Sequence, residues 1–322
     1  MKNSFFAGLL SLTIMISCQQ DKQLTNYVNP LLGTATLWET KDLGYERHLK
    51  TRTWGAEVFP GSSVPNAMVQ LSPVTQFRSG AGYQYEDTVI YGFSHTNKGH
   101  WNLLHLPVLP VTGNVSSGDY ASTYSHSNES ARPGYYQVFL ERYGVNAELT
   151  STLRCAYHKY TFRPDDDKKV LVDITRTNNG VRDWSIQKVD DYTFSGNQDA
   201  EGNIRFYAVS NYKIEDIRQL KDGEHEVSVV SFADSKGSKP LELKIGFSFV
   251  SIDNAKMNLE QEMKDKSFAQ VRKEADKTWE NLLSKIEVTG GTEREKGIFY
   301  SCLYRSFLWP ALRSDVNGEY TD

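Results

Sequence analysis

Residues 135–162 have the sequence YYQVFLERYGVNAELTSTLRCAYHKYTF, and this stretch decides the class of fold. Apolar and polar side chains alternate along 135–140, 145–152 and 156–162. A period of two is typical of β-strands, because successive side chains of a strand point to opposite faces. Short connections between neighbouring strands favour antiparallel pairing. The stretch therefore predicts three consecutive strands of an antiparallel sheet.

The same period of two extends from about residue 26 to residue 250. Glycine and asparagine interrupt it, since both tolerate the positive φ of tight hairpins. These turn signals are Asn179-Gly180, Gly196-Asn197, Glu201-Gly202-Asn203 and Asp222-Gly223. The other predicted strands are 67–71, 88–93, 169–174, 204–210, 226–232 and 241–250. So many strands predict a mainly β fold, a two-sheet antiparallel β-sandwich over residues 26–252, with a long loop at 37–54.

The pattern changes to a helical one after Asp253. Apolar residues recur there at steps of three and four, which predicts one face of a helix in a linker spanning 253–289. That face comprises Phe268, Val271, Ala275, Trp279, Leu282 and Ile286. Gly290-Gly291 ends the linker, and Thr292 with Glu295 forms a capping box that opens a second helix, ended by Pro310.

The second helix is predicted to turn a wide apolar face inward. The inward residues of this prediction are Ile298, Phe299, Cys302, Leu303 and Phe307. One helix cannot bury such a face by itself, so residues 290–322 are expected to begin a helical domain that continues beyond Asp322.

The N-terminus is expected to be a lipoprotein signal peptide, residues 1–17. Lys2 precedes an apolar run from Phe5 to Ile16, which is shorter than the roughly twenty residues that a membrane-spanning helix needs. Ser17-Cys18 resembles the end of a bacterial lipobox, so Cys18 is predicted to be lipidated and followed by a tether at 18–25. We expect an exported protein, lipid-anchored to a bacterial membrane. The alternative is a soluble secreted protein in which Cys18 is incidental.

Composition excludes one class of partner. Forty acidic residues against thirty-six basic ones give a net charge of −4, and no basic run follows a face as a phosphate backbone requires, so nucleic acid is not an expected partner. Cys155 and Cys302 lie far apart in sequence and are expected to be free and buried.

Short motifs in a fixed order carry a more specific signal. They are YVNPLLGT at 27–34, PG at 60–61, VPNAMVQLSP at 64–73, GYQY at 82–85, IYGFSHT at 90–96, YSH at 124–126, PGYY at 133–136, AELT at 147–150, HKYTF at 158–162, Trp279, FYSCLYR at 299–305 and DVNGEY at 315–320. Together they resemble glycoside hydrolase family 92, and the resemblance covers nearly all of the chain after the leader.

The resemblance implies an exo-acting, calcium-dependent α-mannosidase that inverts the anomeric centre. It implies a supersandwich-like N-terminal domain that packs on its own C-terminal (α/α)6 helical barrel, with mannose-containing oligosaccharides or glycoprotein N-glycans as substrates. Inverting hydrolysis needs a general acid and a carboxylate base on opposite faces of the sugar. The family places both after Asp322, together with most Ca²⁺ ligands, so residues 1–322 are expected to hold no catalytic residue and no metal site, and to be inactive alone.

Segment 92–102 is the first candidate for substrate contact, because it is a polar and aromatic loop directly after a predicted strand. Trp101 is predicted to stack on a mannose ring, and His95, His100 and Asn102 to bond its hydroxyls. Packing between the two domains is the alternative role. Many members of the family carry a histidine where Asn97 stands.

Further candidates lie at the two ends of the sandwich region. Trp54 with Glu57 is a candidate for the rim of the sugar site, which Trp38 and Arg47 would join. An ordinary solvated loop is the alternative for each of them. Asp322 is predicted to contact the sugar, and it forms an acidic cluster with Asp315 and Glu319 around the Asn317-Gly318 turn.

Two other functions and a zinc site are the alternatives that parts of the sequence suggest. A lectin-like surface glycan-binding lipoprotein needs only a sandwich and an aromatic platform, but such a module has no use for a helical domain. A phosphorylase of similar architecture is the other alternative. His95, His100 and His105 recur at five-residue steps, which alternates faces of a strand and argues against zinc.

Overall fold

The computed structural model describes residues 23–36, 55–98, 101–222 and 225–321. The predicted signal peptide with Cys18, the predicted loop at 37–54 with Trp54, and both His100 and Asp322 lie outside the described residues. No helix among the described residues has the length and apolar character needed to cross a membrane.

Antiparallel strands make up most of the chain. The strands are β1 (Ser72–Val74), β2 (Val89–Ile90), β3 (Gly92–Ser94), β4 (Asn97–Lys98), β5 (Trp101–Asn102), β6 (Val108–Val111), β7 (Ser122–Thr123), β8 (Glu129–Arg132), β9 (Tyr135–Leu140), β10 (Val145–Ser151), β11 (Cys155–Thr161), β12 (Lys169–Val172), β13 (Asp183–Lys188), β14 (Thr193–Asp199), β15 (Ile204–Ser210), β16 (Ile214–Asp222), β17 (His225–Phe232) and β18 (Leu241–Ser248). The helices are η1 (Leu24–Tyr27), η2 (His126–Asn128), α2 (Ile252–Met263), α3 (Phe268–Leu283) and α4 (Glu293–Ser306).

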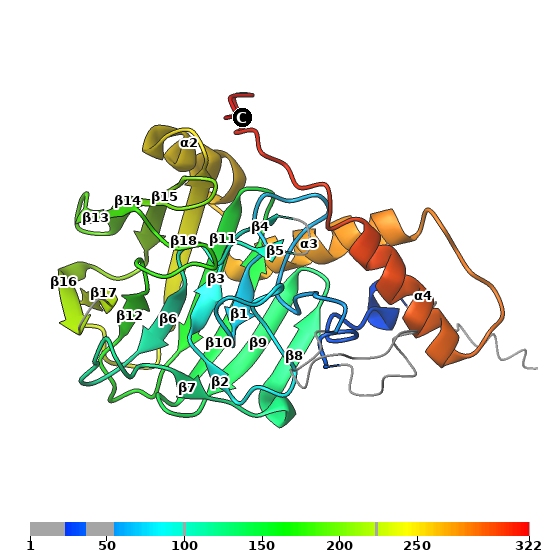
Figure 1. Cartoon of the computed structure of the whole chain (residues 1–322), viewed down its shortest axis with the longest axis horizontal. Helices are drawn as coiled ribbons and strands as arrows, with labels where there is room; N and C mark the ends of the chain where they lie inside the picture. The colour runs from blue at the N-terminus through cyan, green and yellow to red at the C-terminus, as the bar shows by residue number, and fades with distance from the viewer. Residues whose placement is uncertain (1–22, 37–54, 99–100, 223–224, 322) are drawn as a thin grey trace, which may run out of the picture.

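The strands form two large sheets that face each other, which confirms the predicted β-sandwich (Figure 1). One sheet has the order β1-β3-β6-β12-β17-β16, and the other has the order β13-β14-β15-β18-β11-β10-β9-β8. Alternation decides which side chains enter the space between them. On β15, Ile204, Phe206 and Ala208 are buried, whereas Arg205 and Tyr207 are partly exposed on the opposite face. One large cluster of apolar side chains from both sheets forms the core.

The predicted strands 135–140 and 204–210 coincide with β9 and β15. The prediction failed for 67–71, where the structure has no strand and Leu71 forms only an isolated bridge with Ser62. It also failed at Gly196-Asn197, which lies inside β14 and not in a turn. The physical reason is that both neighbouring strands approach Gly196 closely: a Cβ there would lie 1.9 Å from the Ser185 carbonyl oxygen on β13 and 2.7 Å from the Phe206 ring on β15.

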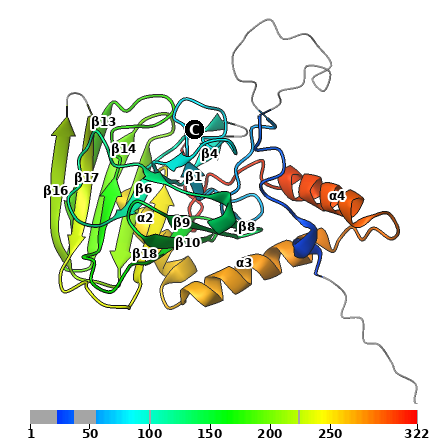
Figure 2. The ribbon, with the colours of Figure 1, turned by 90° about the horizontal axis from the view of Figure 1, so that it is seen from below.

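Helices α2 and α3 cover the outer face of the eight-stranded sheet (Figure 2). The predicted buried face of α3 is confirmed at Phe268, Val271, Ala275 and Trp279, but the last buried residue is Leu283. Ile286 was predicted on this face and instead lies beyond the helix, 48% exposed. The Trp279 indole Nε1 donates a hydrogen bond of 2.7 Å to the Ser63 carbonyl, which fixes α3 to the sandwich.

Helix α4 begins with the predicted capping box of Thr292 and Glu295 and ends at Ser306. Its predicted inward face is confirmed only in part: Leu303 and Phe307 are partly buried and pack against the cluster that contains Trp279. Tyr300, Ser301 and Tyr304 are the buried residues, whereas Ile298, Phe299 and Cys302 are exposed. The tyrosines are buried because their rings pack against those of Trp279 and Tyr27. The ring centroids of Trp279 and Tyr304 lie 4.4 Å apart. Cys155 is buried and free as predicted. Cys302 is free as predicted, but it is exposed and not buried.

We expect Gly246→Ala to destabilise the protein by about 2 kcal/mol, because overpacking forces a backbone shift. Gly246 lies on β18 where α2 crosses it, and a Cβ there would lie 2.2 Å from the Ala255 carbonyl oxygen. Urea unfolding measures the change. Gly297→Ala in α4 is the matched control: its Cβ has only an ordinary contact of 3.6 Å, so stability should stay level or rise. Equal effects of the two substitutions would contradict this account.

Candidate functional site

After α4, residues 308–321 cross one end of the sandwich, and we call them the tail. This end of the sandwich is the candidate site. Asn66 holds the start of the tail. Its backbone N–H donates to the Phe307 carbonyl (2.8 Å), its carbonyl accepts from the Leu312 N–H (2.9 Å), and its Nδ2 donates to the Pro310 carbonyl (2.8 Å). A chain segment with three such bonds to one residue has a defined path over the sandwich.

Asp315 anchors the middle of the tail. Its carboxylate is buried, and it accepts hydrogen bonds from Ser248 Oγ (2.6 Å), Asn254 Nδ2 (2.8 Å) and Asn258 Nδ2 (2.7 Å). These donors come from the end of β18 and from one face of α2. Because a buried carboxylate is stable only when its oxygens are paired, this contact fixes the tail to both elements.

The Asn317-Gly318 turn follows this anchor as the sequence predicts. Gly318 has φ +88°, and the Asp315 N–H donates to the Glu319 carbonyl at 2.8 Å. The Glu319 side chain is exposed and accepts a bond from Asn254 Nδ2 (2.7 Å), which lowers the pKa of its carboxyl. Asp315 therefore acts as a structural anchor in this turn.

A hairpin borders the tail. Its strands β4 and β5 pair Asn97 with Asn102 and Lys98 with Trp101. Gln70 links the hairpin to the tail: its N–H donates to the His95 carbonyl (2.8 Å), and its Nε2 donates to the Leu308 carbonyl (3.2 Å). The hairpin that carries two predicted sugar contacts therefore lies beside the start of the tail.

His95 lies fully buried beneath this hairpin in a line of polar side chains. Its Nε2 lies 2.9 Å from Nε2 of His158, whose Nδ1 lies 2.7 Å from the Tyr160 hydroxyl. Its Nδ1 lies 3.3 Å from the His105 carbonyl. With both rings neutral, every contact is satisfied when His95 donates to the carbonyl, His158 donates to His95, and Tyr160 donates to His158. Burial lowers the pKa of His95 to about 3 and also lowers the pKa of His158.

His105 extends this buried group. Its Nδ1 lies 2.6 Å from the Thr96 hydroxyl, and burial lowers its pKa to about 3. Thr96 is the last residue before β4, so the contact fixes the start of the hairpin. The three histidines thus support the hairpin from within the core as neutral hydrogen-bonding groups.

A cavity of about 500 Å³ lies at the other end of the tail. Thr321 lines it, together with Asn179, Arg182, Arg205 and Phe249. Arg182 is paired with Asp199, and Arg205 donates to the Asn203 carbonyl at 2.9 Å. Asp322 follows Thr321 directly in the sequence but lies outside the described residues.

The structure brings some of the predicted site residues to one end of the sandwich. Trp101 and Asn102 lie in β5, as backbone positions. The ring of His95 faces the core, where it supports the hairpin and presents no nitrogen to solvent. Sequence reasoning missed the anchoring of Asp315 by Asn254 and Asn258. Asn254 and Asn258 are four residues apart on a helix and therefore lie on the same face of it, and this spacing could have indicated a shared polar partner.

The described residues do not fit a metal ion. Across the ranges that the structure describes, no group of three or more His, Cys, Asp and Glu side chains is placed to hold one. Asp315 is the buried carboxylate of the tail, and protein donors occupy both of its oxygens.

Two family models match the chain, and both describe glycosyl hydrolase family 92. A model described as the glycosyl hydrolase family 92 N-terminal domain matches residues 27–248, and a model described as the family 92 catalytic domain matches residues 254–322. A solved family 92 α-mannosidase from Bacteroides thetaiotaomicron is 27% identical, with a TM-score of 0.81, over 93% of this chain and 43% of its own. That mannosidase has also been solved in complex with mannoimidazole.

Two further relatives are more distant. An inverting family 92 mannosidase from Bacteroides thetaiotaomicron is 23% identical, with a TM-score of 0.78, over 92% of this chain and 41% of its own, which supports the fold alone. An uncharacterized secreted glycosidase from Arthroderma benhamiae is 24% identical over 98% of this chain and 45% of its own. The chain thus spans less than half the length of these relatives.

The buried histidines predict a pH dependence of stability. Unfolded histidine has a pKa of 6.5 and folded His95 one of about 3, so between these values the unfolded chain binds more protons. The contribution of neutral His95 to the free energy of unfolding should therefore be fully present above about pH 6.5 and decrease as the pH drops toward about 3. His158→Phe should cost about 1–3 kcal/mol at pH 8 and weaken this dependence.

Urea unfolding at pH 8 and pH 5 measures both effects. Tyr160→Phe is the control, because it removes a hydrogen-bond donor from the same line of contacts but leaves both histidines to titrate. Identical pH dependence in the native chain and in His158→Phe would contradict the proposed cause.

Asp315→Ala should release the tail, because it leaves Asn254 and Asn258 without their buried acceptor. Cleavage by trypsin after Arg313 should become at least about tenfold faster, since local opening controls access to the bond. Glu319→Gln removes an exposed carboxylate from the same turn and should change the rate by less than about twofold. Equal rates for the native chain and Asp315→Ala would show that the carboxylate does not hold the tail.

Proposed function

Because the chain belongs to glycosyl hydrolase family 92, we propose that it is the N-terminal portion of an exported enzyme that removes terminal mannose from α-mannosides, including N-glycans. The observation that carries the proposal is the 27% identity and TM-score of 0.81 to an α-mannosidase over 93% of the chain. The mannoimidazole complex of that mannosidase supports mannose as the sugar recognised.

We place the general acid and the general base in the part of the enzyme that the chain does not span. The chain corresponds to 43% of the solved α-mannosidase, and the carboxylate of Asp315 is fully engaged by protein donors. Inversion requires the two catalytic carboxyl groups to flank the sugar with room for a water molecule. The contribution of this chain is to build the sandwich side of the domain interface.

We propose that Ca²⁺ is bound by the part of the enzyme that this chain does not span. The carboxylates and histidines that the structure describes form no site for it. Ca²⁺ takes six to eight oxygen ligands, and the carboxylates of Asp315 and Glu319 already accept hydrogen bonds from side chains of β18 and α2. We therefore derive no step of the reaction through a metal bound to these residues.

The hairpin of β4 and β5 is the proposed contact of this chain with substrate. Trp101 would stack on the apolar face of a mannose ring, and Asn102 and His100 would bond its hydroxyls. Trp54 and Asp322 remain proposed contacts of the same kind. For His95 the role that the geometry supports is to hold the base of this hairpin, because its ring is buried and bonded.

Export is the remaining part of the proposal. A secreted glycosidase is among the relatives of the chain. The apolar run from Phe5 to Ile16 and the following Ser17-Cys18 support a lipoprotein leader with a lipid anchor on Cys18. Such an anchor would hold the enzyme on a membrane surface, facing external glycans.

We expect the full-length enzyme to release mannose from α-mannosides and to lose this activity in a chelator, whereas residues 1–322 alone release none. Trp101→Ala in the full-length enzyme should raise KM about tenfold by removing a stacking surface, and Trp101→Phe should restore much of the affinity. Quantifying free mannose tests both. Mannose release by residues 1–322 would contradict the placement of the catalytic groups, and no release from any α-mannoside would contradict the activity.

A further inference from the structure

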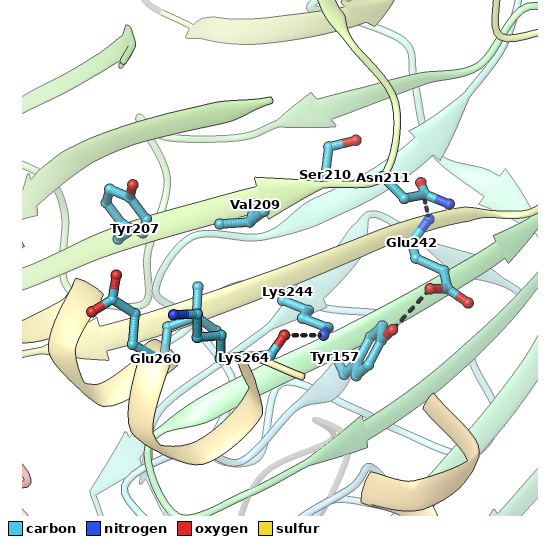
Figure 3. A pocket seen from close by; sticks show the side chains of 10 residues that line it. Tyr157, Tyr207, Val209, Ser210, Asn211, Glu242, Lys244, Glu260 and Lys264 are labelled. Carbon is cyan, nitrogen blue, oxygen red and sulfur yellow. Dashed lines mark hydrogen bonds between the residues drawn. The ribbon is translucent and has the colours of Figure 1, made fainter. Parts of the chain in front are cut away.

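A second cavity lies on the outer face of the eight-stranded sheet, beside α2. It has a volume of about 300 Å³ and lies between β15, β18 and α2 (Figure 3). Tyr207 and Val209 line it from β15, Glu242 and Lys244 from β18, and Leu259 from α2. A volume of this size is at the lower end of small-ligand sites and suits one sugar unit.

Backbone geometry creates this cavity. Gly246 on β18 lets α2 approach so closely that a Cβ there would lie 2.2 Å from the Ala255 carbonyl. Toward the start of β18, Lys244 and Glu242 stand in place of glycine, so their side chains occupy the sheet surface. The helix α2 ends at Met263. A hollow is left where helix and sheet diverge, with Val209 and Leu259 on opposite walls.

The walls of the cavity are held in place. Lys244 Nζ donates to the Met263 carbonyl (2.9 Å) and to the Lys266 carbonyl (2.7 Å), which ties β18 to the end of α2. The Tyr157 hydroxyl donates to Glu242 Oε2 at 2.8 Å, and Lys244 Nζ lies 5.0 Å from the centre of the Tyr157 ring. A site fixed in this way is organised before a ligand arrives.

The rim of the cavity carries both hydrogen-bond acceptors and donors. Glu242 and Glu260 are acceptors, and the Lys264 ammonium and the Tyr207 hydroxyl are donors. Glu242 Oε2 accepts a hydrogen bond from Tyr157, which leaves lone pairs on this carboxylate, and Glu260 forms a long ion pair of 4.0 Å with Lys256. Figure 3 shows Glu260 and Lys264 on the helix side, facing the strand that carries Tyr207 and Val209.

We propose that this cavity is a non-catalytic binding site for a neutral pyranose sugar. A pyranose ring has an apolar face that fits Tyr207, Val209 and Leu259, and hydroxyls that both donate to carboxylates and accept from an ammonium group. The two carboxylates and two ammonium groups of the lining, Glu242, Glu260, Lys244 and Lys264, balance in charge, so the site favours a neutral ligand over an ion. Only the choice of a mannoside as probe rests on the proposed function.

The test is binding of methyl α-mannopyranoside to the purified chain, measured by saturation-transfer NMR and calorimetry. We expect a dissociation constant on the order of millimolar, typical of one sugar unit in a shallow site. Val209→Phe, which fills the cavity, and Tyr207→Ala, which removes the ring, should each weaken binding at least about tenfold. Tyr192→Ala is the matched control, since Tyr192 is 50% exposed and lies outside the cavity.

The remaining variants separate this site from the hairpin. Trp101→Ala should leave this binding unchanged while it raises KM in the full-length enzyme, so the two proposals can fail independently. Mannitol, an acyclic polyol without a ring face, should not compete. Unchanged binding in a folded Val209→Phe variant, loss of binding in Trp101→Ala, equal competition by mannitol, or no binding of any neutral pyranoside would each overturn the proposal.

Discussion

A single buried carboxylate joins three segments that are distant in the sequence. Asp315 accepts hydrogen bonds from Ser248 at the end of β18 and from Asn254 and Asn258 on α2. A charge removed from water needs this full set of partners, so each segment constrains the position of the others. The tail, α2 and β18 are therefore held in fixed positions relative to one another.

The sequence predicted the sandwich well because alternation reports burial directly. It was least reliable where polar atoms or ring packing decide burial. On α4, Tyr300 and Tyr304 are buried against Trp279 and Tyr27, while the more hydrophobic Ile298 is exposed. Tyrosine has a large apolar ring that a ranking by side-chain polarity undervalues. Gly196 shows a second limit, since an aromatic ring from the next strand fills the space that a glycine leaves inside a sheet.

The sequence located candidate residues along the chain but did not show how they are bonded. Segment 92–102 was predicted to follow a strand, and in the structure β3 is followed by the hairpin of β4 and β5. The segment gave no means of telling a histidine that meets solvent from one that is bonded in the core. His95 and His158 contact each other across 63 residues, and such a pairing depends on the register of both sheets. Local pattern does not contain that information.

The order of strands in the larger sheet has a consequence for how the chain is made. Strands β8 to β11 form one local meander and β13 to β15 form another, and β18 is the neighbour that lies between them. A chain that emerges from its N-terminus presents both meanders before the strand that unites them exists. Closure of the sheet waits for residue 248, and α2, which shields β18, begins only four residues later, at Ile252. Until β18 is present, the edges of β11 and β15 that it pairs with have no strand partner, and unpaired edges of this kind favour aggregation.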